Sequence, residues 1–342
     1  MKVLLLAGGN SNEREVSLNS GASMCEALRR LGHEVLAIDP ASGRSLIGSG
    51  GEFLLEDESQ ASAQGTLPQL VEPRALATAL AASQFSDVEV VMIALHGGTG
   101  ENGTIQNLLD LAGKKYTGSG MLASAVAMNK ALSKRIMKSL SIPTPRWALM
   151  RVDQPSEIPS VVRRIGELFE PPLIVKPNDG GSTIGLTKVE STGQLTEAVQ
   201  AAMKHTRSLL VEEFIPGREV TVSVFDGRAY PVVEIRPKSG LYDYEAKYTR
   251  GKSEYLAPAP IEPTVARQLQ QAAETLCGAV GAAGLARVDF VLGADDQFFC
   301  LELNSLPGMT ALSLAPMAMK CEGISYDQLV SMLLESALKR KS

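Results

Sequence analysis

The sequence predicts a protein of the α/β and α+β classes, with a doubly wound parallel sheet at its N-terminal end. Two strand–loop–helix units in residues 1–118 predict the parallel sheet, because each helix can carry the chain back to start another strand in the same direction. Alternating polar and apolar residues after position 217 predict half-buried strands. The 342 residues suffice for two or three domains of ~100–200 residues.

The N-terminal elements follow from apolar runs and the glycines that end them. The first strand passes through Gly8-Gly9-Asn10-Ser11 into an amphipathic helix. Residues 41–67 are rich in Gly, Ser, Gln and Glu and are interpreted as a surface loop with some short strand. The elements predicted here are strands 3–7, 34–38 and 88–95, a loop over 96–103, and helices 13–31, 73–83 and 104–112.

Two further parts follow a glycine-rich turn near residue 118. A helix ends before Pro143 and Pro145, which cannot continue it. The elements predicted here are helices 123–140, 193–202 and 264–280, a loop over 177–185, and strands 173–176, 209–213, 220–224, 231–235, 287–292 and 298–304. We therefore expect three domains, at 1–118, 119–216 and 217–342.

Composition and charge exclude several classes of protein. Lys and Arg total 33 against 38 Asp and Glu, so the net charge of −5 lacks the basic surplus that nucleic-acid binding needs. No apolar run approaches the ~20 residues that span a bilayer, so we expect no membrane partner and a cytoplasmic protein. The four cysteines form no CxxC pair and the three histidines lie far apart, which argues against a zinc site or a disulfide framework. We expect reduced, buried thiols.

Residues 98–103 match GxGxxG after a strand and before a helix, as a dinucleotide-binding turn would. The acidic residue that should follow about twenty positions later to bind ribose is missing. We therefore interpret this motif as a tight turn. The sequence also contains no GxxxxGK[ST] and no GxSxG, so neither a P-loop nor a serine-hydrolase nucleophile is supported.

Two segments of the central part could bind a nucleotide. Lys176 ends an apolar strand and precedes a loop rich in glycine and hydroxyl groups, which can surround phosphates, although a glycine-rich hairpin would look the same. Residues 211–219 combine a strand end with apolar residues and the spaced carboxylates Glu212 and Glu219. This pattern suits an adenine slot, and a solvated charge cluster is the alternative.

Polar residues alternate with apolar ones in two strands of the C-terminal part, which places Arg287, Asp289, Glu302 and Asn304 on one face. Carboxylate and amide oxygens are the ligands of Mg²⁺ when it also bridges nucleotide phosphates. Solvent-facing strand polars are the alternative, although Phe290 beside them has the character of a buried residue.

Together these residues resemble the D-alanine–D-alanine ligases, a family of ATP-grasp enzymes, over essentially the whole chain. The matching blocks are residues 8–17, 95–97, 116–120, 176–177, 242–248, 287–289 and 302–310. The resemblance implies an ATP-grasp fold with an N-terminal substrate domain, a central lid domain and a C-terminal catalytic domain. It also implies ATP and Mg²⁺, or Mn²⁺, as cofactors, D-alanine as substrate, a role in peptidoglycan precursor synthesis, and a homodimer.

The resemblance also implies residue roles. Lys130, Lys176 and a loop residue, Lys247, would hold the ATP phosphates, and Asp289, Glu302 and Asn304 two metal ions. Glu212 would bind the adenine amino group, Phe214 and Ile215 the adenine edge through their backbone, and Glu219 the ribose. Glu13 would bind the first D-alanine's ammonium, with Ser182 and Tyr248 fastening the loop and His96 near this substrate. Arg287 and the Gly308 amide would stabilise the oxyanion, and Ser313 would receive the second carboxylate.

The sequence departs from this family at residues 178–181, where relatives usually carry an arginine–glutamate pair before the glycine and serine. Tyr248 favours D-alanine as second substrate, because lactate-using relatives tend to lack this tyrosine. Three alternatives stay open: another ATP-grasp carboxylate–amine ligase, a ligase that makes D-alanyl-D-lactate or D-alanyl-D-serine, and a nucleotide-sensing protein without chemistry.

Overall fold

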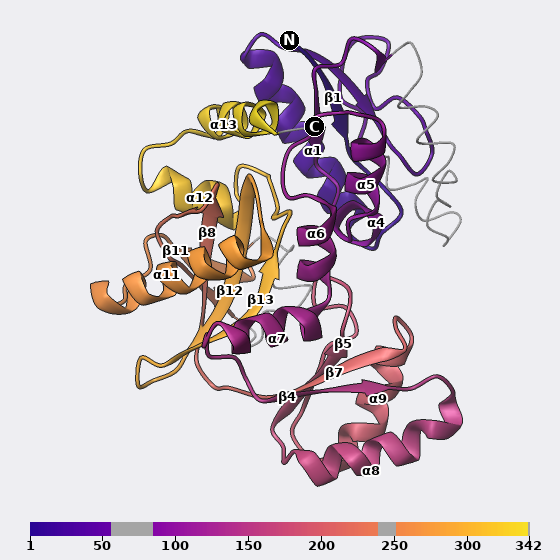
Figure 1. Cartoon of the computed structure of the whole chain (residues 1–342), viewed down its shortest axis with the longest axis vertical. Helices are drawn as coiled ribbons and strands as arrows, with labels where there is room; N and C mark the ends of the chain where they lie inside the picture. The colour runs from indigo at the N-terminus through magenta and orange to yellow at the C-terminus, as the bar shows by residue number, and fades with distance from the viewer. Residues whose placement is uncertain (56–84, 239–250, 341–342) are drawn as a thin grey trace.

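The computed structural model describes residues 1–55, 85–238 and 251–340 (Figure 1). The predicted helix at 73–83 and the predicted loop residues Lys247 and Tyr248 lie outside the described residues. Within the part of the chain that is described, no helix is both long and apolar enough to cross a bilayer.

The N-terminal part contains the predicted parallel sheet. Strands β1 (Lys2–Leu6), β2 (Glu34–Ile38) and β3 (Val90–Ile93) pair in the order β2-β1-β3, with both pairings parallel. Helix α1 (Arg14–Arg30) connects β1 and β2, as the sequence predicts. The prediction of a loop over 96–103 is wrong in part, because this segment contains the short helix α4 (Gly98–Glu101). Helix α5 (Thr104–Leu111) follows it.

The predicted single helix over 123–140 is two helices, α6 (Met121–Met128) and α7 (Lys130–Ser139). Asn129 separates them with an extended backbone, and its side chain caps α7 by accepting a hydrogen bond from the Leu132 N–H at 3.0 Å. The Lys130 N–H donates to the Asn178 carbonyl at 3.0 Å. A contact with the loop after a distant strand thus accompanies the break, and the local apolar pattern does not reveal it.

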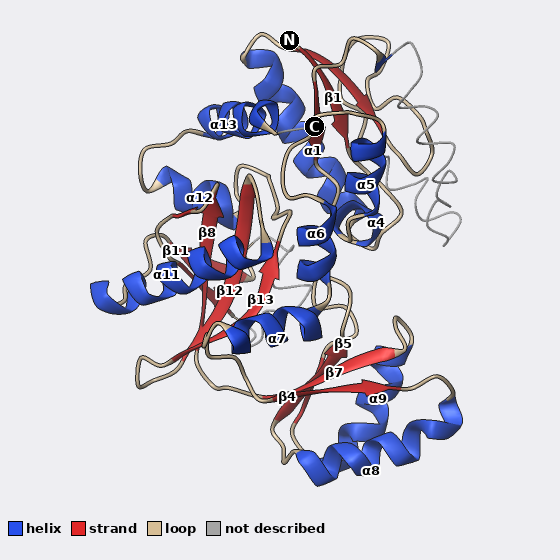
Figure 2. Cartoon of the chain, in the orientation of Figure 1, coloured by secondary structure: helices blue, strands red, loops and turns tan. Residues whose placement is uncertain are grey.

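The central part is a four-stranded antiparallel sheet with helices on one side (Figure 2). Its strands run in the order β4 (Trp147–Arg151), β7 (Ser208–Glu213), β5 (Leu173–Pro177) and β6 (Thr187–Val189). Helices α8 (Ile158–Leu168) and α9 (Leu195–Met203) share its apolar core, and the short 3-10 helices η2 (Pro155–Glu157) and η3 (Thr192–Gln194) precede them. The sequence analysis predicts β5, β7 and α9 but misses β4, β6 and α8.

The C-terminal part is built on antiparallel strands in the order β11-β10-β8-β12-β13, with β9 paired to β8. Their bounds are β8 (Arg218–Phe225), β9 (Arg228–Ala229), β10 (Val233–Pro237), β11 (Ser253–Leu256), β12 (Leu285–Leu292) and β13 (Phe298–Asn304). Helix α11 (Pro263–Val280) shares a core with β8 and β12. The strands predicted at 220–224, 287–292 and 298–304 are therefore present.

Two helices that the sequence analysis does not predict, α12 (Leu314–Lys320) and α13 (Tyr326–Lys339), end the chain. Helix α13 lies beside α1 (Figure 1), where Leu333 and Leu334 share an apolar core with Leu28 and Met92. Each of the three sheets lies within one of the expected domains at 1–118, 119–216 and 217–342, and the boundaries themselves stay a prediction.

All four cysteines lie in the described residues and none forms a disulfide. Cys25, Cys277 and Cys300 are buried, as expected. Cys321 is exposed, so the expectation that every thiol is buried is wrong there. The reason is its position in the turn that ends α12, outside the apolar face of that helix.

Candidate active site

Two adjacent cavities collect most of the predicted site residues. The larger, of about 740 Å³, lies against α1 and the loop after β13, and the smaller, of about 180 Å³, lies where the central and C-terminal sheets face each other. Both are lined by Lys130, Glu302 and residues 180–182. The loop after β5 and the start of α7 therefore form the wall that the two cavities share.

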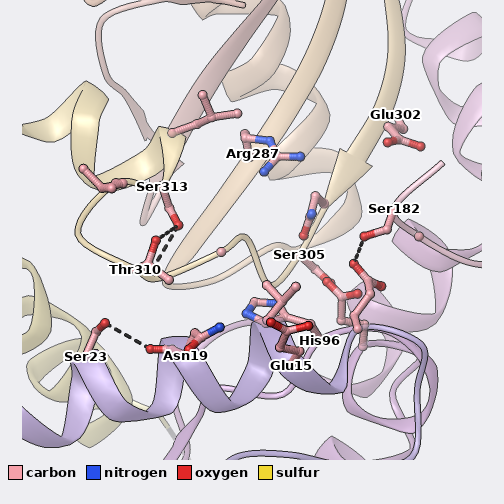
Figure 3. A pocket seen from close by; sticks show the side chains of 18 of the residues that line it. Glu15, Asn19, Ser23, His96, Ser182, Arg287, Glu302, Ser305, Thr310 and Ser313 are labelled. Atoms are coloured by element: carbon pink, nitrogen blue, oxygen red, sulfur yellow. Dashed lines mark hydrogen bonds between the residues drawn. The ribbon is translucent and has the colours of Figure 1, made fainter. Parts of the chain in front are cut away.

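The larger cavity brings together residues predicted to bind amino acids. Figure 3 shows His96 and Glu15 on the α1 side of this cavity, facing Arg287 and Ser313 on the other side. The predicted residues that line it are Glu13, His96, Lys130, Ser182, Arg287, Glu302, Asn304, Gly308 and Ser313. These residues come from all three expected domains, so the cavity depends on the way the three sheets meet.

Glu13 is a buried carboxylate directly before α1, held by short contacts with two loops. The Ser182 hydroxyl donates a hydrogen bond to Glu13 Oε1. A Cβ atom at Gly181 would lie 2.5 Å from Glu13 Oε2, and one at Gly97 would lie 2.6 Å from it. Because neither glycine has a Cβ atom, both backbone segments can approach the carboxylate this closely without displacing it. The carboxylate is thus held in place as an anchor for a cationic group.

Ser182 and Thr183 adopt left-handed backbone conformations, with φ of 51° and 63°. Residues with a side chain rarely adopt this region, and such strain often accompanies functional loops. Here the strained turn follows residues 178–181, where the sequence departs from its relatives, and it still directs the Ser182 hydroxyl onto Glu13.

His96 and Glu101 are two further buried ionisable groups of this cavity. Burial lowers the pKa of His96, whose Nε2 lies 3.0 Å from the Ser20 hydroxyl, so the imidazole is neutral at pH 7. Burial, and then the charge of Glu13, raise the pKa of Glu101 to about 8. The Gly97 N–H donates to Glu101 Oε2 at 2.7 Å. Glu101 is therefore protonated at neutral pH, and the sequence analysis did not single it out.

The loop after β13 brings Gly308 beside Ser313. A Cβ atom at Gly308 would lie 3.1 Å from Ser313 Oγ, which is also 2.8 Å from Thr310 Oγ1. Ser313 directly precedes α12, and its hydroxyl accepts a hydrogen bond from the Thr310 N–H at 3.0 Å. Thr310 and Ser313, directly before α12, thus present hydroxyl groups to the cavity, which suits the binding of a carboxylate.

The smaller cavity brings together the residues predicted to bind a nucleotide. Those that line it are Lys130, Lys176, Glu212, Phe214, Ile215, Glu219, Asp289 and Glu302. Lys188 Nζ lies 4.0 Å from the centre of the Phe214 ring. Lys130 Nζ donates to the Gly180 carbonyl at 2.6 Å and lies 3.4 Å from Glu302. An apolar slot with lysines at one end is the arrangement that a nucleoside triphosphate requires.

Glu212 is buried between two lysines at the wall of this cavity. Its Oε2 lies 2.6 Å from Lys176 Nζ and its Oε1 lies 2.6 Å from Lys134 Nζ. Burial alone would raise the pKa of Glu212, but the two ammonium groups hold it below its ordinary value. Burial lowers the pKa of Lys134, whereas the charges of Glu212 and Glu302 outweigh burial and raise that of Lys176. The sequence analysis misses Lys134, because a lysine in an amphipathic helix is usually exposed.

Three oxygen-bearing side chains lie on adjacent strands where the cavities meet. Asp289 and Glu302 are directly opposite each other on β12 and β13, and Asn304 follows on the same face. Arg287 donates to both Asp289 oxygens at 2.8 and 2.9 Å. Two adjacent carboxylates with an amide oxygen fit a hard divalent cation. No group of three or more His, Cys, Asp and Glu suited to a metal occurs among the described residues.

The chain is similar to known proteins along nearly its whole length. The family models for the D-ala D-ala ligase N-terminus and C-terminus match residues 2–119 and 136–335. The chain is 42% identical over 340 residues to a D-alanine–D-alanine ligase of Syntrophotalea carbinolica, covering 99% of this chain and 97% of that protein. It is 39% identical over 340 residues to a D-alanine–D-alanine ligase of Gloeobacter violaceus, covering 99% of this chain and 100% of that protein. The solved structure of VanG D-Ala:D-Ser ligase from Enterococcus faecalis superposes with a TM-score of 0.79, at 28% identity over 98% of this chain and 99% of that chain.

Proposed function

Because the chain belongs to the D-alanine–D-alanine ligase family, whose members join two D-alanine molecules at the expense of ATP, we propose that it catalyses this ligation for peptidoglycan precursor synthesis. The observation that carries the proposal is the shared wall of the two cavities. Lys130 and Glu302 line both the cavity that holds Glu13 and the one that holds Glu212. A phosphoryl group can therefore pass from a nucleotide on one side to an amino acid on the other.

In the proposed reaction, the carboxylate of the first D-alanine takes the γ-phosphoryl group of ATP. The amine of the second D-alanine then attacks the acylphosphate, giving the dipeptide, ADP and phosphate. This chemistry gathers negative oxygens in one place, so catalysis depends on positioning and on cationic groups. Lys130 and Lys176 supply such charge at the wall of the smaller cavity, and Lys247, outside the described residues, is expected to add to it.

In the larger cavity, Glu13 binds the ammonium group of the first D-alanine, and His96 lies beside it. Arg287 and the Gly308 amide stabilise the oxyanion of the tetrahedral intermediate, and Ser313 receives the second carboxylate. Tyr248 is expected to close the loop with Ser182 and shield the acylphosphate from water. These roles are supported by the common placement of the described residues around one cavity.

Asp289, Glu302 and Asn304 would hold Mg²⁺, or Mn²⁺, at the junction of the cavities. When bound, the metal supplies positive charge that neutralises phosphate oxygens and orients the triphosphate. The existing partners of these carboxylates, Arg287 and Lys130, show that the site already balances negative with positive charge. Glu212 and Glu219 bind the adenine amino group and the ribose, and the backbone of Phe214 and Ile215 binds the remaining adenine edge.

A coupled assay of ADP release with D-alanine, together with mass spectrometry of the dipeptide, tests the proposal. We expect ADP release that requires D-alanine and a divalent metal. Folded protein without D-alanine-dependent turnover would contradict the proposal.

The same assay with D-lactate, D-serine and L-amino acids tests the second substrate, and we expect D-alanine to be preferred. Relatives at 42% and 39% identity over 99% of this chain are D-alanine–D-alanine ligases, which supports that preference.

We propose two further properties from the resemblance to the family. We place the reaction in the cytoplasm, where ATP is made, and we expect a homodimer. Sedimentation equilibrium measures the assembly directly, and a mass near the 36.3 kDa of a single chain would contradict the dimer.

A further inference from the structure

We propose that Lys134 is a positioning residue that makes the smaller cavity select nucleotides with a 6-amino purine over those with a 6-oxo purine. It does so by holding the Glu212 carboxylate ionised and in place. This inference rests on the proposed binding of ATP in this cavity, and it adds a role for Lys134 and a preference for one class of purine.

Lys134 is fixed inside the protein. Its side chain is 0% exposed, and Nζ lies 2.6 Å from Glu212 Oε1. Nζ donates to the Thr144 hydroxyl at 2.6 Å, and that hydroxyl donates to the Cys300 carbonyl at 2.8 Å. These contacts connect α7 to the segment before β4 and to β13. The ammonium group therefore cannot turn toward solvent, and its position relative to Glu212 is set by three separate elements.

Glu212 retains capacity to accept a hydrogen bond from a ligand. Its Oε2 lies 2.6 Å from Lys176 Nζ and its Oε1 lies 2.6 Å from Lys134 Nζ. The residue lines the smaller cavity. Each oxygen of an ionised carboxylate can accept a second hydrogen bond. An amino group on a bound base would donate to a lone pair that the two lysines leave open.

The charge of Glu212 decides which base fits. An ionised carboxylate only accepts hydrogen bonds, so it can bind the 6-amino group of adenine but repels the 6-oxo group of hypoxanthine. Burial favours the protonated acid, which would donate to a 6-oxo group, and the two lysines oppose that tendency. The charged and titratable groups around this pair are Lys134 on α7, Lys176 on β5, Cys300 and Glu302 on β13, and Glu219 on β8.

The test compares binding of ATP and inosine triphosphate to the full chain by titration calorimetry, in the wild type and in Lys134→Met. Methionine keeps an unbranched side chain, one atom shorter than that of lysine, and removes its charge. We expect the wild type to prefer ATP by about tenfold or more at pH 7, because a mismatched buried polar group is strongly rejected. In Lys134→Met only Lys176 opposes the effect of burial on Glu212, so we expect the preference for ATP to fall at pH 7 and to return as the pH rises and Glu212 ionises. Lys138→Met, which removes an exposed lysine from the same helix, should keep the wild-type ratio.

A purely structural role for Lys134 would weaken both nucleotides equally and would not depend on pH. A folded Lys134→Met variant with the wild-type ratio of ATP to inosine triphosphate affinity overturns the inference. If that variant does not fold, Lys134→Met is combined with Glu212→Gln, which removes both charges of this pair and leaves Lys176 an amide oxygen as its partner. The glutamine amide both donates and accepts, so we expect this double variant to bind the two nucleotides alike. An undiminished preference for ATP in it overturns the inference.

Two results separate this inference from the proposed ligase activity. A wild-type chain that turns over D-alanine but binds ATP and inosine triphosphate equally overturns the role of Lys134 and leaves the ligase activity standing. A wild-type chain that prefers ATP, loses that preference in Lys134→Met and shows no D-alanine-dependent turnover supports Lys134 and contradicts the ligase.

Discussion

The two cavities of the active site are built from different kinds of backbone. In the smaller one, the polar side chains lie on paired strands: Lys176 on β5, Glu212 on β7, Asp289 on β12 and Glu302 on β13. In the larger one, Glu13 precedes a helix, Ser182 lies in a strained loop, and Ser313 directly precedes another helix. Sheet register sets the first group, and close contact between loops sets the second.

This difference predicts how substitutions at each cavity reduce binding and turnover. A substitution at the smaller cavity should reduce them by removing a charge, since the strand backbone remains paired. A change at the larger cavity should also act through lost space, because its loops approach one another only where a residue has no side chain. Four variants test this contrast.

Glu302→Ala should have the largest effect, because this carboxylate lines both cavities and belongs to the proposed metal site. We expect kcat for D-alanine-dependent ADP release to fall by about 100–1,000-fold, the usual loss when one charge-stabilising group is removed. Glu335→Ala, at an exposed position on α13, should leave the rate unchanged. Near-normal turnover in Glu302→Ala would remove this residue from the metal site.

Glu13→Gln should affect amino-acid binding and leave nucleotide binding alone. The variant loses the charge proposed to bind an ammonium group, and we expect KM for the first D-alanine to rise by about 10–100-fold. The affinity for ATP, measured by calorimetry, should stay within about twofold of the wild type, since Glu13 lines only the larger of the two cavities. Glu34→Gln, at an exposed position on β2, is the matched control. An equal loss of ATP affinity in Glu13→Gln would show that the cavities do not act separately.

Gly181→Ala tests the dependence of the larger cavity on space. The new methyl group would lie 2.5 Å from Glu13 Oε2, so the carboxylate or the loop must shift. We expect about a tenfold rise in KM for D-alanine, because small displacements of a positioned group reduce rates. Gly193→Ala, where nothing lies within 4 Å of the added atom, should behave as the wild type. An unchanged KM in Gly181→Ala would mean that the loop tolerates the shift.

Glu101→Gln should have the smallest effect on turnover, and its main effect should be on the free energy of unfolding. The wild-type pKa of Glu101 is raised to about 8 by burial and by Glu13, so the folded protein binds a proton that the unfolded chain releases near pH 4.5. The stabilisation from this protonated acid is complete below pH 4.5 and is lost as the pH rises to about 8, at about 1.4 kcal/mol per pKa unit. Glutamine stays neutral and still accepts from the Gly97 N–H.

Urea unfolding at pH 5, 7 and 9 measures this difference. We expect Glu101→Gln to match the wild type at pH 5 and to exceed its unfolding free energy by a few kcal/mol at pH 9. The same pH profile in both proteins would show that Glu101 ionises as it would in solvent.

The sequence predicted elements whose pattern is local. Strand β2 at 34–38 and strand β13 at 298–304 have the predicted bounds, because apolar residues and their flanking turns define them without help from the rest of the chain. The break at Asn129 was not predicted, because its bond to the Asn178 segment joins residues far apart in sequence. Helices α12 and α13 were also missed, and their apolar residues are covered partly by the N-terminal sheet.

For the candidate site, the residues themselves indicated Lys176, Glu212 and the face containing Asp289 and Glu302. Strand alternation places such groups together. The roles of Glu13, His96 and Ser313 could be predicted only from the resemblance to the family, since nothing in the nearby sequence distinguishes a helix-start acid or a loop histidine that binds a substrate. The importance of Lys134 and Glu101 could not be predicted from the sequence, because it depends on their burial, and only the folded structure shows that they are buried.

The packing of α13 on α1 has a consequence for synthesis. Arg30 pairs with Asp327, 297 residues later in the chain, beside the core that Leu333 and Leu334 share with Leu28. On the ribosome, α1 therefore emerges long before the part of its apolar face that packs on α13 is covered. During that interval it is exposed to chaperones and to other nascent chains.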